Sequence, residues 1–280
     1  MITNASSFQL TTHFSDLHPE NLSYAGDKAL ILVEACRLCQ EPDSSIQQQL
    51  TTAWSFPSTT FKFIDQGVVQ AFIVANEQVI LLCFRGSDSR EDWQANLNFP
   101  KDPVAIGQVH QGWWRALDKV WTAIEDHIKT VRTPENPQSI WVTGHSLGGA
   151  LATLATFRLG QAGLPLSGLY TFGQPRVGNR RFGQAFDLQF KQRSFRFANN
   201  NDGVTIVPPA LFNYVHIGNF LYFTHAGELR KTPTVAYTTW DFSRGLLAGI
   251  GRQGIEIAND HSIGAYMQLI RKNFADNPFA

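Results

Sequence analysis

Cysteine is scarce in this sequence, with three residues in a chain of 280. An odd and small number of cysteines argues against a disulfide framework, and favours a reducing compartment or a protein exported without a leader. Cys36 and Cys39 form a C-x-x-C pair, but they lie on an apolar helical run without a second pair or a nearby histidine. We therefore expect them to pack inside a helix rather than to serve a redox or metal site, and we expect Cys83 in a buried strand.

The sequence also has no excess of either charge, because 23 basic residues balance 23 acidic ones. That balance gives no electrostatic reason for binding nucleic acid or an acidic membrane, and we expect no nucleic-acid partner. No apolar stretch approaches the roughly 20 residues that a transmembrane helix needs. Residues 1–20 lack the basic start and apolar run of a secretory signal. These features predict a cytoplasmic protein without a transmembrane segment, with leaderless secretion as the alternative; the oligomeric state stays open.

Metal and phosphate motifs are missing as well. The sequence has no H-x-x-H or H-E-x-x-H pattern, no clustered acidic ligands and no glycine-rich phosphate loop after a strand. We therefore expect no metal and no cofactor. What is present is a globular composition, 43% apolar and 16% charged, with enough apolar residues for a sizeable core. Without repeats or low-complexity tracts, residues 1–280 are expected to form one domain, in which residues 1–20 are an irregular arm.

Strand-like and helix-like segments alternate along the chain. Apolar spacing predicts helices over residues 25–40, 113–131, 147–159, 182–190 and 262–274. Short β-prone runs predict strands over residues 68–74, 79–84, 139–143, 169–172 and 194–197, the first two joined by a hairpin turn. This alternation predicts an α/β fold, in which helices flank a central, mostly parallel mixed sheet.

The strongest motif is Gly144-His145-Ser146-Leu147-Gly148-Gly149, between a predicted strand and a predicted helix. A G-x-S-x-G sequence at such a turn holds the serine in a strained backbone and lifts its hydroxyl clear of the sheet. The helix that follows presents unpaired N–H groups, so the Leu147 N–H is well placed to stabilise an oxyanion. We therefore interpret Ser146 as a nucleophile.

A nucleophilic serine needs a histidine base, which a carboxylate orients. Only His216, His225 and His261 follow Ser146. His216 lies in the strand-like run Tyr214–Ile217 and His225 in a turn, whereas His261 lies in a loop just before the last helix. We favour His261 as the base.

The acid is expected to follow the serine along the chain and to precede the histidine. Asp202 follows the β-prone run 194–197 in an asparagine-rich loop, and we favour it. Asp187 falls on a predicted helix and is expected to be solvated. Asp241 and Asp260 remain alternatives, although Asp260 cannot easily reach the ring of its own neighbour.

Six motifs in order resemble the filamentous-fungal lipase family (lipase class three), a group of α/β-hydrolases. They are Phe84-Arg85-Gly86-Ser87, Val109–Trp113, Val142–Ala150, Thr171–Asn179, Asn201–Val204 running to Pro208-Pro209, and Asp260-His261. The match covers about residues 68–270. By resemblance, Ser146, Asp202 and His261 occupy the family's triad positions. Ser87 occupies the position whose N–H is the second oxyanion donor.

The resemblance also implies a short helical lid over residues 88–99. Trp93 and Leu97 are one helical turn apart and give it a narrow apolar stripe, but Arg90 and Gln94 stand where aliphatic residues are expected in a strongly interfacial lipase. Residues 246–257 could edge the acyl cleft or form a tight surface excursion. We expect His110 to be structural.

The resemblance implies a serine ester hydrolase, a lipase or esterase that releases fatty acids from acylglycerols. The polar lid favours as the alternative a polar-lipid acyl hydrolase of the phospholipase A1 or galactolipase type. A catalytically dead hydrolase fold that only binds ligands is the third hypothesis. The expected partner is a lipid or ester substrate, with a transient contact to a lipid interface.

Overall fold

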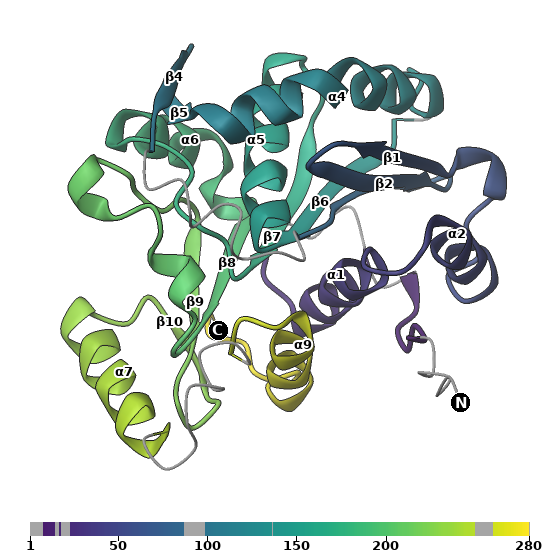
Figure 1. The fold of residues 1–280 in the computed structure, drawn as a ribbon. Coiled ribbons are helices and arrows are strands. Elements are labelled where there is room, and N and C mark those ends of the chain that lie inside the picture. The colour runs from purple at the N-terminus through teal and green to yellow at the C-terminus, as the bar shows by residue number, and fades with distance from the viewer. Residues whose placement is uncertain are drawn as a thin grey trace, which may run out of the picture.

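The centre of the structure is an eight-stranded sheet (Figure 1). The structure is a computed structural model, and it describes residues 8–14, 17, 23–86, 99–135, 137–249 and 260–279. In spatial order the strands are β1 (Lys62–Gln66), β2 (Val69–Ala75), β3 (Val79–Phe84), β6 (Ser139–His145), β7 (Leu166–Phe172), β8 (Ser194–Asn199), β9 (Asn219–Phe223) and β10 (Leu229–Lys231). In this sheet β3, β6, β7, β8 and β9 run parallel to one another, whereas β1, β2 and β10 pair antiparallel. The expected mixed, mostly parallel sheet is confirmed.

The order of the parallel strands decides which helices cover which face. Because β3, β6, β7, β8 and β9 follow one another in one direction, right-handed crossovers place the connecting helices on the same face. These helices are α4 (Gln111–Val131), α5 (Leu147–Gln161) and α6 (Arg180–Phe190), and their apolar residues share one core cluster. The other face is left for α1 (Gly26–Leu38), α2 (Asp43–Thr52) and α9 (Ile263–Lys272), from the two ends of the chain.

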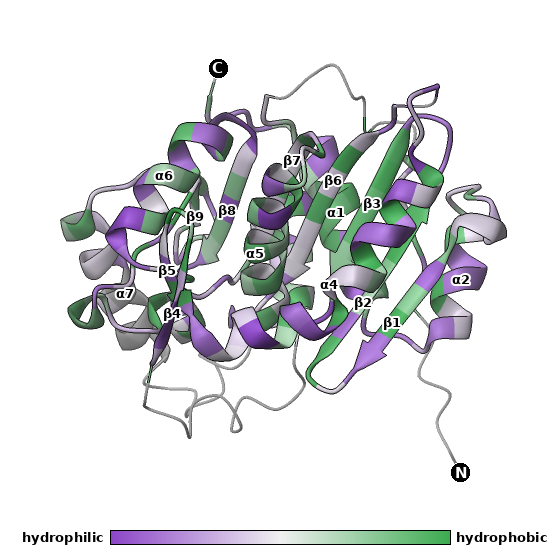
Figure 2. Cartoon of the chain, turned by 90° about the horizontal axis from the view of Figure 1, so that it is seen from above, coloured by the Kyte–Doolittle hydropathy of each residue, from purple (hydrophilic) through white to green (hydrophobic). Residues whose placement is uncertain are grey.

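The buried strands show why the sheet is apolar on both faces. All six residues of β3 are buried. Leu82 and Phe84 face the cluster beneath α4 and α5, whereas Leu81 and Cys83 face the cluster beneath α1. Strands covered on both sides therefore read as continuous apolar runs, as β2 and β3 do in Figure 2.

Helix α1 explains the cysteine pair. Cys36 on α1 and Cys39 directly after it are buried with free thiols, and Cys36 Sγ lies 3.3 Å from the hydroxyl of Thr143 on β6. The expected packing role is confirmed. Glu34, also on α1, pairs with Arg271 of α9 at 2.7 Å, so the two ends of the chain meet on one face of the sheet.

Several elements were not expected from the sequence. These are α2, β1, the hairpin of β4 (Lys101–Val104) and β5 (Gly107–His110), the strands β9 and β10, and helix α7 (Val235–Gly249). The run Tyr214–Ile217 was expected to be strand-like, but it joins no strand and Val215 makes only an isolated bridge with Gly178. A β-prone tetrapeptide needs a paired neighbour to become a strand, and sequence does not show that neighbour.

His110 is a structural residue, as expected. It precedes α4, its side chain accepts a hydrogen bond from the N–H of Trp113, and its ring stacks on the Trp113 ring with centroids 3.9 Å apart. Burial, with a smaller effect of Lys101, lowers the pKa of His110 to about 4. The neutral ring is therefore the form that caps the helix.

We expect this histidine to make stability depend on pH. Its folded-state pKa lies below the unfolded value of about 6.5, so the unfolded chain binds the proton first. The contribution is complete above pH 6.5 and is lost as the pH falls towards 4, about 2–3 kcal/mol in total. The free energy of unfolding of the wild type should fall more steeply over this range than that of His110→Gln. Parallel curves would contradict the prediction.

Candidate active site

Ser146 stands at the turn between β6 and α5. Its φ of 58° and ψ of −127° lie in the left-handed region, which costs a residue with a side chain backbone strain. The turn is held by surrounding backbone bonds, since the Ser146 N–H donates to the Phe172 carbonyl on β7 at 2.9 Å. The next residue, Leu147, begins α5, whose first N–H groups have no partner within the helix. The local geometry is that of the expected nucleophile elbow.

Glycines allow three chain segments to meet at this turn. A Cβ on Gly144 would lie 2.2 Å from the Gly148 carbonyl oxygen, and a Cβ on Gly148 would lie 2.3 Å from the Phe84 carbonyl oxygen at the end of β3. A Cβ on Gly86 would lie 3.3 Å from the Cβ of Ser146. The chain that leaves β3 therefore passes directly beside the serine.

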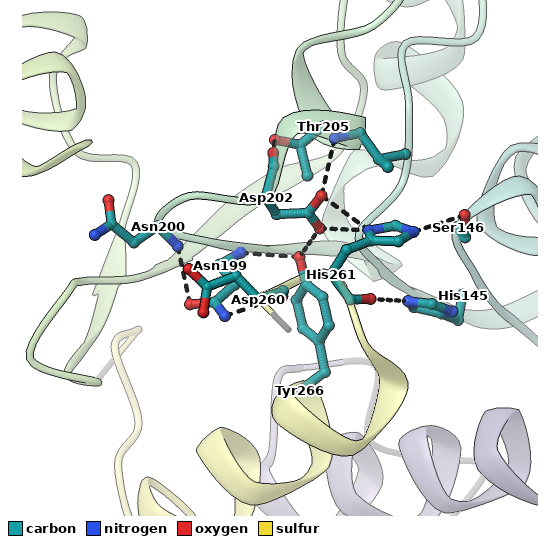
Figure 3. A network of polar contacts seen from close by, with 10 residues as sticks. His145, Ser146, Asn199, Asn200, Asp202, Thr205, Asp260, His261 and Tyr266 are labelled. Carbon is teal, nitrogen blue, oxygen red and sulfur yellow. Dashed lines mark hydrogen bonds and ion pairs between the residues drawn. The ribbon is translucent and has the colours of Figure 1, made fainter. Parts of the chain in front are cut away.

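His261 and Asp202 complete a hydrogen-bonded chain with Ser146 (Figure 3). His261 Nε2 lies 2.8 Å from Ser146 Oγ, and His261 Nδ1 lies 2.8 Å from both carboxylate oxygens of Asp202. With the ring proton on Nδ1, the histidine donates to Asp202 and accepts from the serine hydroxyl. All three side chains are buried. Asp202 follows β8 and His261 precedes α9, so residues far apart in sequence meet at the carboxyl ends of the parallel strands.

Further groups hold Asp202 in place, and sequence reasoning missed the most prominent of them. The Val204 N–H donates to Asp202 Oδ1 at 2.9 Å, and the Tyr266 hydroxyl donates to Oδ2 at 2.6 Å. Burial raises the pKa of Tyr266 well above its usual value, and the nearby Asp202 raises it further, so the hydroxyl stays protonated. The Asn199 N–H in turn donates to the Tyr266 hydroxyl at 2.9 Å. In the sequence, the weak signal for this contact is a tyrosine on the predicted helix that follows His261.

Two other neighbours shape the space around His261. Gly173, at φ 61°, leaves room for the acid–base pair, because a Cβ there would lie 2.8 Å from Asp202 Oδ2. His145 Nε2 lies 2.6 Å from the His261 carbonyl oxygen and holds the backbone of His261. Both residues belong to motifs that the sequence analysis recognised, but neither had been given a role.

The rejected histidines lie elsewhere. His216 is half-buried, and burial together with two nearby arginines lowers its pKa well below the usual value. His225 lies in a turn, where its N–H donates to Asp241.

The other aspartates considered as the acid make contacts elsewhere in the structure. Asp241 is buried against Tyr222 and His225. Asp260 contributes its backbone carbonyl to Asn199. Asp187 was expected to be solvated, but it is only partly exposed, because it accepts the Gly218 N–H at 2.7 Å. The structure thus brings only Asp202 of these four acids to the His261 ring among the contacts of the described residues.

Some expected site residues lie outside the described residues. These are Ser87, both apolar residues of the expected lid, Trp93 and Leu97, and most of the segment 246–257. Among the described residues no cluster of histidine, cysteine and acidic side chains could hold a metal ion. No helix in the described part of the chain is long and apolar enough to cross a membrane.

Comparison with known proteins identifies the family of this chain. The sequence model of the class 3 lipases matches residues 81–212. A secreted mono- and diacylglycerol lipase of Fusarium solani is 37% identical over 160 residues, which are 56% of this chain and 47% of that protein. A solved triacylglycerol lipase, described as having a serine protease triad as its catalytic centre, is 32% identical with a TM-score of 0.51, over 61% of this chain and 71% of that one. The chain belongs to the class 3 lipase family.

Membership of the class 3 lipases confirms the α/β-hydrolase fold that the motifs implied. A second relative, the secreted mono- and diacylglycerol lipase A of Penicillium cyclopium, is 32% identical over 148 residues, 52% of this chain and 48% of that protein. The chain spans less than half of the length of the curated relatives that it matches.

The expected cytoplasmic location is wrong. Both of these curated relatives are named as secreted lipases, which points to an extracellular location for members of this kind. The expectation rested partly on the low number of cysteines. A core of this size does not need disulfides, so their scarcity excludes a disulfide scaffold without identifying a compartment.

Proposed function

We propose that this chain is a serine carboxylic-ester hydrolase that releases fatty acids from acylglycerols. The observation that carries the proposal is the continuous chain from Ser146 Oγ through His261 to Asp202, with 2.8 Å at each step. It stands on a strained elbow at the start of a helix, where a tetrahedral oxyanion is stabilised best. The relatives named as mono- and diacylglycerol lipases support the substrate class.

The reaction follows from this arrangement. As the Ser146 hydroxyl attacks the ester carbonyl, His261 Nε2 takes its proton, and the resulting imidazolium is stabilised by the Asp202 carboxylate. His261 then gives the proton to the leaving alcohol, and an acyl-enzyme remains on Ser146. A water molecule, activated by the same histidine, hydrolyses the acyl-enzyme and regenerates the serine.

We assign the oxyanion hole to the N–H groups of Leu147 and Ser87. Leu147 begins α5, where the helix dipole also favours negative charge. For Ser87, support comes from Gly86, which lies against Ser146 and directly precedes it in sequence. Loss of one such donor costs about 10²–10³ in kcat.

We also infer that residues 1–280 form one domain with residues 88–99 as a lid that carries Trp93 and Leu97. The meeting of α1 and α9 on one sheet face supports the single domain. For the lid, Phe99 at its end contacts Phe212, which is half exposed in the loops beyond Asp202. A lid at this place opens towards a lipid interface.

The test is hydrolysis of p-nitrophenyl esters from acetate to palmitate, below and above the solubility limit of each ester. We expect hydrolysis of the dissolved short esters, and a rise in rate for long esters once they form a separate phase. Triglyceride emulsions and phospholipid or galactolipid micelles, assayed in parallel, identify the head group. A folded protein that hydrolyses none of these esters would refute the proposal, and a preference for the polar lipids would replace acylglycerols as substrate.

A further inference from the structure

Helix α7 is attached to the molecule in an unusual way. It lies beside β9 and β10, away from the centre of the sheet (Figure 1). Val235 is 82% and Trp240 51% exposed, and among the described side chains of α7 only Asp241 is buried. A helix normally docks through an apolar stripe, whereas the described side chains of α7 contact the sheet through the Asp241 carboxylate and through the Tyr237 ring, whose centroid lies 4.8 Å from the Arg230 guanidinium carbon.

Burying a carboxylate is costly unless it is paired, and Asp241 is well paired. Its Oδ2 accepts hydrogen bonds from the Tyr222 hydroxyl on β9 at 2.9 Å and from the His225 N–H at 3.0 Å. The His225 ring lies 3.6 Å from Oδ1. Burial, and secondly Asp241, raises the pKa of Tyr222, so this hydroxyl remains protonated.

The contacts continue from Tyr222 to both loops of the proposed active site. Asn200 Oδ1 lies 2.9 Å from the Tyr222 hydroxyl and is the second acceptor within reach of its single proton. The Asn200 N–H donates to Asn199 Oδ1 at 2.9 Å, and Asn199 Nδ2 donates to the carbonyl of Asp260 at 3.0 Å (Figure 3). Asn200 is two residues before the acid Asp202, and Asp260 directly precedes the base.

We propose that Asp241 is a positioning residue, which through Tyr222 and Asn200 fixes the loop of Asp202 and the peptide that precedes His261. This inference rests on the proposed ester hydrolase function. Each link is made by groups that are buried or nearly so, and such links transmit small displacements because little water competes for them. The acid and base have to stay within a few tenths of an ångström of their working geometry, which one loosely attached loop would not provide.

The experiment compares variants at two points of this chain. Asp241→Ala removes the acceptor on α7, Tyr222→Phe removes the hydroxyl without changing any charge, and Asp241→Asn keeps an acceptor oxygen. With a dissolved short-chain p-nitrophenyl ester, we expect the first two to lower kcat about tenfold with KM within twofold. Asp241→Asn should recover most of the wild-type kcat. The matched control is Asp187→Ala, which removes a carboxylate of α6 that accepts the Gly218 N–H and should lower the melting temperature without lowering kcat.

A second measurement keeps the two proposals separable. The proton between His261 Nδ1 and Asp202 should give a low-field NMR signal in the wild type, and this signal should broaden or disappear in Tyr222→Phe. This signal reports the geometry of His261 and Asp202 even if the protein hydrolyses no ester. In that case the proposed function would be wrong, while the positioning role of Asp241 could still be tested. A folded Tyr222→Phe variant with unchanged kcat and an unchanged low-field signal would overturn the inference. So would an Asp241→Asn variant as slow as Asp241→Ala.

Discussion

Replacing Ser146 with alanine is expected to lower kcat for dissolved esters by about 10⁴-fold or more. The hydroxyl is the group that would form the acyl-enzyme, and no other hydroxyl lies against His261 Nε2 among the contacts of the described residues. Binding and oxyanion stabilisation remain in such a variant, so a small residual rate above that in water is expected rather than none. Labelling by a fluorophosphonate, which reacts with activated serines, should be lost at the same time.

The variant should stay folded, because alanine meets the same strain at φ 58° as serine does and loses only one side-chain hydrogen bond. A matched control is Ser139→Ala at the opposite end of the same strand, where the hydroxyl lies 3.3 Å from the Gln78 carbonyl. That variant should keep wild-type kcat and labelling. If Ser146→Ala kept more than about 1% of the wild-type rate, the hydrolysis would have to come from another group, because loss of a serine nucleophile costs far more than that.

The central sheet and the elbow could be predicted because both leave local patterns. The buried parallel strands read as short apolar runs, and helices such as α4 repeat apolar residues at helical spacing. The G-x-S-x-G sequence between a strand and a helix combines a chemical requirement with a steric one, and the structure shows that steric requirement at Gly144 and Gly148. For these elements, the information needed lies within about ten residues of the chain, the range over which periodicity is read.

The polar contacts that hold the loops of Asp202 and His261 could not be predicted, because they join segments that are distant in the sequence. Tyr266 reaches Asp202 across 64 positions of the sequence, and Asn200 meets Tyr222 across 22. Nothing in a single sequence shows that a helical tyrosine points at one loop rather than another. The same reason accounts for the run Tyr214–Ile217, where β-propensity is present but the neighbouring strand is not.

Replacing Asp202 with asparagine is expected to lower kcat by about 10⁴-fold at neutral pH while leaving the fold intact. The carboxylate accepts hydrogen bonds from His261, Tyr266 and the Val204 N–H at once. Asparagine has a single acceptor oxygen, so its amide nitrogen has to face one of these donors. When that nitrogen faces His261, it favours the tautomer with the proton on Nε2, which cannot accept the proton of Ser146.

The size of this loss distinguishes the acid from its alternatives and from a merely structural residue. Asp187→Asn changes another carboxylate that accepts a backbone N–H, and it should leave kcat unchanged. The proposed role of Asp202 lies in the chemical step, so its replacement should lower kcat far more than it raises KM, and fluorophosphonate labelling should slow in proportion. If Asp260→Asn lowered kcat more than Asp202→Asn, Asp202 would not be the carboxylate that orients His261, because it is Asp202 whose two carboxylate oxygens lie 2.8 Å from His261 Nδ1.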